Sequence, residues 1–293
     1  MQRSKPDIVF IVLDTHRIDR LGCYGYPRGT TPNLDAFTER ATLFERAISP
    51  AQWTIPSHAS MFSGEYPSTH GTIQAADALS DVFPTLAELL QREGYQTTGF
   101  CNNPLVGVLE NGLRRGFEAF YNYGGAIPSP PATDQGRASW LLTRLRGWYR
   151  KLLNQVAQPI QQAVAASPTV FGTILNPSLV SLWTRHANFK GDTRRSIRDT
   201  TGFLSDFDRN EKPQFVFLNL MEPHLPYTPL ERFTRQFAPI VKEEKAASDF
   251  INRYNKQALR WLLPLERPLS AIEAKTLHDM YDAEVAYQDH LLA

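Results

Sequence analysis

Thr54 is the residue of this sequence best placed to do chemistry, because it stands just ahead of a short helix predicted to begin near Pro56 and to end at Gly64. The free N–H groups and positive end of a helix receive sulfate or phosphate oxygens, which would hold the Thr54 hydroxyl against the central atom of such an anion. A divalent cation liganded by Asp14 could bind the same hydroxyl and lower its pKa. The pattern indicates nucleophilic attack on a sulfate or phosphate ester.

The groups that would surround Thr54 follow predicted strands. Continuous apolar runs are typical of strands buried on both faces in a parallel sheet. Ligands of doubly wound sheets bind beyond the carboxyl ends of the strands, so we expect the residues that follow these strands to converge on Thr54. Buried strands are predicted at 8–13, before Asp14, and at 214–221, before Glu222 and His224, and another strand is predicted at 96–101, before Asn102 and Asn103.

His224 is the predicted general acid, since an imidazole there can protonate a leaving group or stabilise an ester oxygen. A catalytic role is also assigned to His58, and a substrate-binding role to Ser57, Asn102 and Asn103. Each type of residue has a plainer alternative: a Thr before Pro is commonly a helix N-cap, an Asp at a strand end a turn residue, and a His-x-Pro segment loop packing. The order of the residues along the chain decides between these interpretations.

The composition fits one large α/β domain or two ordinary ones, with 293 residues of which 42% are hydrophobic. The 31 basic residues nearly balance the 30 acidic ones, which gives no reason to expect a nucleic-acid partner. Two cysteines cannot form a disulfide framework. The first apolar run is too short for a secretory signal, and no later stretch approaches a membrane span, so the sequence predicts a cytoplasmic protein.

Residues 124–199 are predicted to be a helical insertion. Prolines open a loop at 128–131, and a helix is expected over 138–157. Five basic residues and no acidic residue lie between Arg137 and Lys151, which suits contact with a membrane surface. A helix that covers the domain and has a solvated basic face is the favoured interpretation.

The order of the motifs resembles the sulfatase family of the alkaline-phosphatase superfamily. The family's Arg-x-Asp-x-Leu-x-x-Tyr-Gly segment is matched at 17–25, directly after Asp14, and its Thr-Pro-Asn-Leu-Asp segment at 31–35. Residues 51–58, around Thr54, are similar to the nucleophile segment, and 220–227 resemble the later His-x-Pro-Tyr segment. Residues 281–289 are similar to a helix that precedes the last metal-binding strand of family members. The matches cover nearly the whole chain outside the insertion.

The resemblance implies an α/β domain with a central, mostly parallel sheet flanked by helices, and a divalent ion (Ca, Mg or Mn) bound in part by Asp14 and Thr54. Sulfatases use a Cys or Ser oxidised to formylglycine, whereas Thr54 is β-branched, so formylglycine is not expected. Thr is the nucleophile of the related phosphoglycerol and phosphoethanolamine transferases. His58 replaces the usual Arg and Thr15 the usual second Asp, which reduces the charge around the anion and the metal and favours a different ester or slower chemistry.

The C-terminal part of the family domain is predicted to be missing. The family's remaining metal ligands, an Asp followed by His or Asn, should lie beyond the helix at 281–289, and the sequence ends at Ala293. Asp289 and His290 imitate that pair, but successive residues on a helix point about 100° apart and rarely ligate one ion. A single carboxylate binds a divalent ion poorly, which leaves half a metal site.

We therefore expect residues 1–293 to form an incomplete sulfatase-like catalytic domain that hydrolyses sulfate esters with a divalent ion. The expected substrate is a small molecule or a glycan or lipid ester, and a membrane-surface contact is not favoured. A phosphoester hydrolase, or a phosphoglycerol- or phosphoethanolamine-type transferase that uses Thr54, is the nearest alternative. A catalytically inactive fragment that only binds is the alternative of another class.

Overall fold

A computed structural model describes residues 5–74, 77–124, 190–205, 212–257 and 267–293. The chain clusters into two compact units, the first over 1–12, 48–171 and 187–220, and the second over 13–47, 172–186 and 221–293. Most of the predicted insertion, including the helix expected over 138–157, lies outside the described residues.

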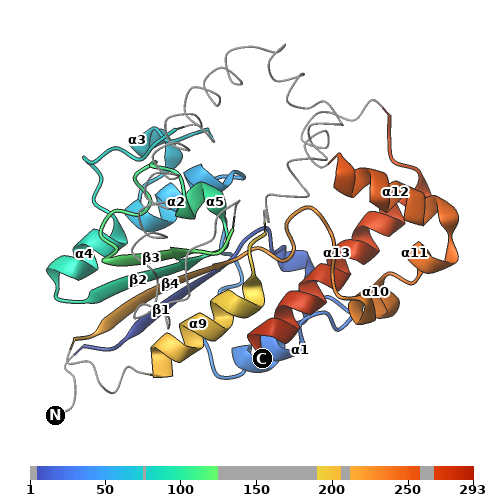
Figure 1. Ribbon diagram of the computed structural model, residues 1–293, viewed down its shortest axis with the longest axis horizontal. Helices are drawn as coiled ribbons and strands as arrows, with labels where there is room; N and C mark the ends of the chain where they lie inside the picture. Colours follow the sequence, from blue (N-terminus) through green and yellow to red (C-terminus); the bar gives the residue numbers. More distant parts are fainter. Residues whose placement is uncertain (1–4, 75–76, 125–189, 206–211, 258–266) are drawn as a thin grey trace, which may run out of the picture. The chain divides into compact units, whose positions relative to one another are not determined.

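A four-stranded sheet in the order β1-β4-β2-β3 forms the centre of the first unit (Figure 1). β2 runs parallel to both β4 and β3, and Cys101 at its end pairs with Asn219 on one side and Asn122 on the other. The expectation of a mostly parallel sheet is confirmed. The strands are β1 (Ile8–Leu13), β2 (Gln96–Cys101), β3 (Ala119–Asn122) and β4 (Gln214–Leu220).

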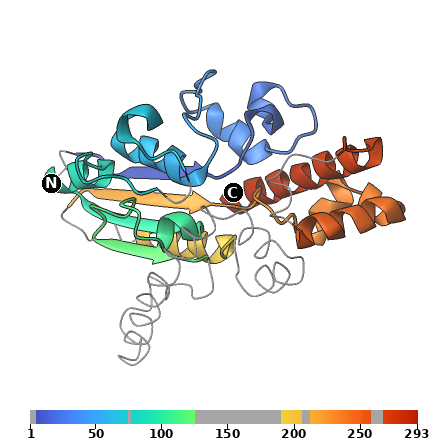
Figure 2. The same ribbon diagram turned by 90° about the horizontal axis from the view of Figure 1, so that it is seen from above.

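Helices cover both faces of this sheet, and α2 and α9 lie on opposite sides of it (Figures 1 and 2). On one side Phe62 of α2 packs against Phe217 of β4, with ring centroids 5.0 Å apart. On the other side Phe203 of α9 packs against Phe100 of β2 at 5.7 Å. Within the described residues, the helices of the unit are α2 (Thr54–Ser63), α3 (Pro67–His70), α4 (Leu86–Arg92), α5 (Pro104–Gly107) and α9 (Thr193–Ser205).

Local sequence signals set the ends of these helices. α4 begins with a capping box, in which Thr85 Oγ1 accepts from Glu88 N at 3.2 Å and Glu88 Oε2 accepts from Thr85 N at 2.8 Å. α2 ends at Gly64, whose φ of +75° lies in the left-handed region that glycine adopts without strain. The predicted end of this helix is confirmed.

β1 is less buried than its apolar sequence predicts. Val9 and Ile11 are 42% and 45% exposed, although Phe10 packs against Phe217 with ring centroids 6.0 Å apart. β1 stands at one end of the strand order, and α9 packs on β2 and β4. The described residues therefore leave one face of β1 uncovered, and the expectation of a strand buried on both faces is wrong for β1, whereas every residue of β4 is buried.

The second unit is assembled around α13 (Ala271–Leu292), which begins at a capping box formed by Ser270 and Glu273. Its core includes Phe250, Tyr254 and Met280. No helix in the described ranges is both long and apolar enough to cross a membrane. The other elements of the unit are η1 (Ile18–Arg20), η2 (Gly22–Tyr24), α1 (Pro32–Thr38), α10 (Glu231–Phe237), α11 (Ile240–Glu243) and α12 (Lys245–Lys256).

Phe217→Ala should lower the free energy of unfolding of the first unit by about 3–5 kcal/mol, because the side chain is fully buried and its removal leaves a cavity among aromatic rings. Tyr66→Ala is the control, since Tyr66 is 71% exposed and its loss should change stability by no more than about 0.5 kcal/mol. Urea unfolding of both variants measures the difference. Equal midpoints would contradict the assignment of Phe217 to the core.

Candidate active site

Thr54 is the first residue of α2, which begins two residues before Pro56. The N-cap is Trp53, in extended conformation and without a side-chain capping bond, and Trp53 O accepts the first helical bond from Ser57 N at 3.1 Å. The plain N-cap alternative for Thr54 is therefore wrong. Because N–H groups of a first turn have no partner within the helix and Pro56 has no N–H, the main-chain donors beside the Thr54 hydroxyl are those of Thr54 and Ile55.

Asn103 places its amide group next to this hydroxyl. Its Nδ2 donates to Thr54 Oγ1 at 3.4 Å, while its Oδ1 accepts from Leu105 N at 3.0 Å and caps α5. The cap fixes the orientation of the amide, since a carbonyl oxygen held by the α5 N–H leaves the NH₂ group to face Thr54. The expected convergence of the end of β2 with Thr54 is thus observed at Asn103.

Asn102 faces the other side of the sheet. Successive residues of an extended segment point in opposite directions, and Asn102 Nδ2 donates to Thr193 Oγ1 of α9 at 2.8 Å. Its Oδ1 is buried and has no hydrogen-bond partner among the described residues. Asn102 therefore fixes the start of α9 at the carboxyl end of β2, and its predicted contact with a substrate stays a prediction.

His58 is turned into the protein and is 2% exposed. Its Nδ1 lies 2.8 Å from Thr54 O, and since a carbonyl only accepts, Nδ1 carries a proton and donates. Its Nε2 lies 3.3 Å from Asn219 Nδ2, which can donate to it when the ring is neutral. The imidazole also packs edge-on against Phe217 at 6.1 Å. His58 thereby ties the first turn of α2 to β4.

Asn219 was not identified as a site residue from the sequence. It is fully buried within β4 and bonds to His58, so it belongs to the group of side chains that hold the first turn of α2. The sequence feature that could have identified Asn219 is its amide side chain within the otherwise apolar run 215–220. Such a residue needs a polar partner, because an unpaired amide in a core costs free energy.

The first turn of α2 contains no acidic residue. Ser57, which is half-buried, lies 3.2 Å from Ser49 Oγ, and Ser49 in turn donates to Ala51 O at 2.6 Å. A hydroxyl has one hydrogen, so Ser57 is the donor to Ser49. In the part of the chain that the structure describes, the start of α2 therefore presents main-chain N–H groups, hydroxyls and the Asn103 amide, which are neutral donors that suit a tetrahedral anion.

Asp14 lies in the second unit, in a turn that α13 holds. Thr15 has φ +59°, a left-handed conformation that is unusual for a β-branched residue, and its hydroxyl donates to Asp14 O at 2.6 Å. Tyr281 of α13 donates to Thr15 O at 2.6 Å and accepts from Arg17 N at 2.8 Å. Burial raises the pKa of Tyr281 to about 12, so the phenol keeps the proton that it donates to Thr15.

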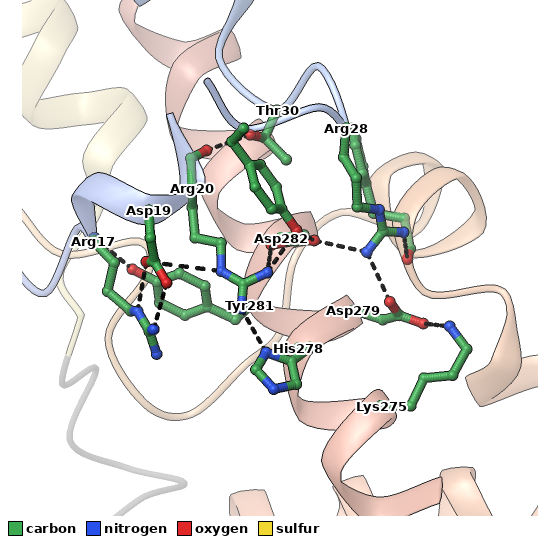
Figure 3. Close-up of polar contacts among 12 residues, drawn as sticks. Arg17, Asp19, Arg20, Arg28, Thr30, Lys275, His278, Asp279, Tyr281 and Asp282 are labelled. Atoms are coloured by element: carbon green, nitrogen blue, oxygen red, sulfur yellow. Dashed lines mark hydrogen bonds and ion pairs between the residues drawn. The ribbon is translucent and has the colours of Figure 1, made fainter. Parts of the chain in front are cut away.

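An ion-pair network joins the next part of this loop to α13 (Figure 3). Asp282 is fully buried and lies 3.4 Å from Arg20 Nη1 and 2.6 Å from Arg28 Nη1. Arg28 also reaches Asp279 at 2.7 Å. A buried carboxylate is stable only when it is paired, so these arginines are required where Asp282 lies.

His224 also lies in the second unit. Its Nδ1 donates to Leu225 O at 2.8 Å, since a carbonyl oxygen only accepts. Asp289, on α13, accepts from Asn33 N at 3.1 Å and from Leu34 N at 2.8 Å, and so satisfies N–H groups at the start of α1. The carboxylate of Asp289 therefore stabilises the start of α1. This structural role agrees with the sequence analysis, which did not favour Asp289 as a metal ligand.

The described residues do not complete a divalent metal site. They contain no group of three or more His, Cys, Asp or Glu side chains that could hold an ion. Thr15, which stands where the family has its second Asp, turns its hydroxyl back to Asp14 O. One carboxylate and one hydroxyl fall short of the six or more ligands that ions such as Ca²⁺ take. Asp14 and Thr54 as metal ligands stay a prediction.

The family model described as Sulfatase matches residues 6–293. The chain belongs to the sulfatase family. Among the relatives of this sulfatase-family chain, human arylsulfatase A is 27% identical over 238 residues, which cover 75% of the chain and 42% of that protein. An arylsulfatase of Clostridium perfringens is 24% identical over 86% of the chain and 50% of that protein. The chain thus spans about half the length of these curated relatives.

Solved structures share the fold of this sulfatase-family chain. A phosphonate monoester hydrolase of Agrobacterium radiobacter has a TM-score of 0.58 at 17% identity, with 98% of this chain and 58% of that chain covered. The C-terminal periplasmic domain of EcEptC from Escherichia coli, solved with Zn, has a TM-score of 0.53 at 15% identity, with 98% and 57% covered. The resemblance to the alkaline-phosphatase-like sulfatases, inferred from the motifs, is confirmed.

His70 should make the stability of the first unit depend on pH. Its Nδ1 accepts from Thr72 N at 3.0 Å, so the neutral ring donates from Nε2 to Ser60 Oγ at 2.9 Å, and burial lowers the pKa of His70. The unfolded chain binds this proton near the ordinary pKa of about 6.5, so the contribution is present above that pH and is lost as the pH falls towards the folded pKa.

Urea unfolding of wild type and His70→Gln, between about pH 5 and about pH 8, checks this prediction. The difference in unfolding free energy between the two proteins should shrink as the pH falls. The reason is that His70 binds a proton more readily in the unfolded wild-type chain than in the folded protein, whereas glutamine binds none. A difference that is constant over this range would contradict it.

Proposed function

We propose that the chain carries the nucleophile of a sulfate-ester hydrolase and that Thr54 Oγ1 is that nucleophile. The observation that supports this most is the contact of Asn103 Nδ2 with Thr54 Oγ1 at the start of α2. It places an oriented donor and the end of a helix around one hydroxyl, in a family whose curated relatives include arylsulfatases. Sulfate esters of small molecules or glycans are the substrate class that these relatives favour.

In the proposed reaction, Thr54 Oγ1 forms a bond to the sulfur and gives up its proton to water, as the bond from sulfur to the leaving oxygen breaks. The leaving alcohol takes up a proton, for which His224 Nε2 is the proposed donor. Water then attacks the sulfur of the Thr54 sulfate ester, which releases sulfate and restores the hydroxyl. The Asn103 N–H stabilises charge on Oγ1 during both steps, and the N–H groups of the α2 first turn bind the non-bridging oxygens.

The other predicted site residues have smaller parts in this proposal. His58 is a positioning residue, because it bonds to the carbonyl of Thr54 from within the core. Ser57 is proposed to contact the substrate at the rim of the site, whereas Asn102 is fully buried and faces α9, so it is given no contact with the substrate in this proposal. The family resemblance implies a divalent ion near Asp14 and Thr54, but no step is assigned to it, because the described residues do not complete its ligand set.

Phosphoester hydrolysis or transfer is the second candidate, and the nucleophile itself favours it. Thr54 is an unmodified, β-branched hydroxyl, which by family resemblance is typical of phospho-group transferases. Two solved structures with this fold are phosphonate monoester hydrolases, of Agrobacterium radiobacter and of Silicibacter pomeroyi.

An assay of hydrolysis ranks these ester classes as substrates. It compares nitrophenyl sulfate, phosphate monoester and phosphodiester substrates, with and without Ca²⁺, Mg²⁺ or Mn²⁺. If none of these esters is hydrolysed with any of the metal ions, the alternative of an inactive fragment that only binds is favoured.

Thr54→Ala should lower turnover by the intact protein about 10³-fold or more, because no other group replaces the nucleophile. The fold should be unchanged, since the Thr54 side chain does not cap α2. Thr54→Ser keeps the hydroxyl and should retain turnover, and Thr69→Ala on the exposed face of α3 is the matched control. Wild-type turnover by Thr54→Ala would overturn the assignment.

Asn103→Ser should lower kcat by about 10²–10³-fold, the usual cost of a lost donor to developing charge. A serine can still cap α5, so the thermal stability should change little, but its side chain is too short to reach Thr54 Oγ1. Steady-state kinetics and thermal unfolding of this variant separate the two effects. An unchanged kcat in a folded variant would show that Asn103 serves only as a cap.

A further inference from the structure

The start of α9 concentrates positive charge in a nearly neutral chain. Residues 190–205 contain four basic and two acidic side chains, a net charge of +2, whereas all 293 residues together carry +1. The side chain of Arg198 is 73% exposed, and Arg194 is also exposed. We define the α9 basic cluster as Lys190, Arg194, Arg195 and Arg198.

Both carboxylates of this segment are engaged by the protein. Asp199 is buried, accepts from Tyr123 OH at 2.9 Å, and lies 3.8 Å from Arg195 Nε. Arg198 Nε lies 3.7 Å from the same carboxylate. Asp192 accepts from Arg195 N at 3.0 Å, in the first turn of the helix. One buried carboxylate is thus shared by two guanidinium groups that reach solvent, so its single negative charge does not balance both of them.

The cluster begins at the same sheet edge as Thr54. Asn102 Nδ2 bonds to Thr193 Oγ1 at 2.8 Å, and a Cβ added to Gly191, which has φ +71°, would lie 2.9 Å from the Asn102 side chain. The next residue, Asn103, lies 3.4 Å from Thr54 Oγ1. α2 and α9 cover opposite faces of the sheet (Figure 1). The start of each helix therefore lies next to the carboxyl end of β2, one on each face.

We propose that the α9 basic cluster binds a second anionic group of the substrate, so that preferred substrates carry at least two sulfate or phosphate groups. The inference rests on the proposed function, because it places the reacting ester at Thr54. Guanidinium groups bind tetrahedral oxyanions through paired hydrogen bonds. The positive field of the cluster and of the α9 N-terminus raises the local concentration of a polyanion, and salt screens this effect. A monoanionic aryl ester gains nothing from the cluster.

Calorimetric titration of the intact protein tests the cluster without requiring turnover. A heparin-derived tetrasaccharide and inositol hexakisphosphate are the probes, since one carries sulfates on a glycan and the other phosphates on a small ring. Arg194→Ser/Arg198→Ser should weaken binding of at least one probe by about tenfold at low salt, and less at high salt. The matched control is Arg92→Ser, an exposed arginine in the last turn of α4.

Kinetics completes the test. KM for a disulfated substrate should rise about tenfold in the double variant, while kcat/KM for nitrophenyl sulfate stays unchanged. Equal affinity of wild type and double variant for both probes would overturn the proposal, and so would an equal loss in Arg92→Ser. Probe binding that survives Thr54→Ala separates this site from the nucleophile. Probe binding without turnover of any ester would contradict the proposed function and leave the anion site in place.

Discussion

The parallel pairing of β2 with β4 is the constraint on which the surroundings of Thr54 depend. Its register sets Cys101 beside Asn219, so the polar residues at the ends of both strands meet the first turn of α2. Asn219 reaches His58 and Asn103 reaches Thr54. A slip of one residue in that pairing would turn Asn219 to the opposite face and leave His58 without its partner. The register of the sheet therefore determines which side chains lie around Thr54.

In the proposed function, the site at Thr54 recognises an anion through donors in fixed directions more than through net charge. His58, which stands where the family has an arginine, is buried and donates to a main-chain carbonyl, so it adds no exposed cation to the first turn of α2. The amide of Asn103 and the helix N–H groups are neutral donors in fixed positions, and such donors stabilise developing charge without reorganisation. Four basic side chains lie near the start of α9, which covers the other face of the sheet.

The sequence predicted the strands 8–13 and 96–101 residue for residue, and the first of them is an apolar run bounded by polar residues. It also predicted that Asn103 would approach Thr54, since the helix starts at the edge of the sheet where the parallel strands end. It missed the exposure of β1 and the bond between Asn219 and His58, because both depend on which strands are neighbours. A pattern within one segment does not contain that information, and β3 was too short to stand out.

The second unit is closed by contacts between the two ends of the chain. Tyr281 bonds to Thr15 across 266 residues, and Asp289 to Leu34 across 255. During synthesis the turn at Asp14 emerges first and meets its partners only after α13 has left the ribosome. Contacts of such separation carry a large loop-closure entropy and form slowly. Because β4 ends at Leu220, all strands of the first unit are synthesised before α13, and the turn at Asp14 gains its contact with Tyr281 only after them.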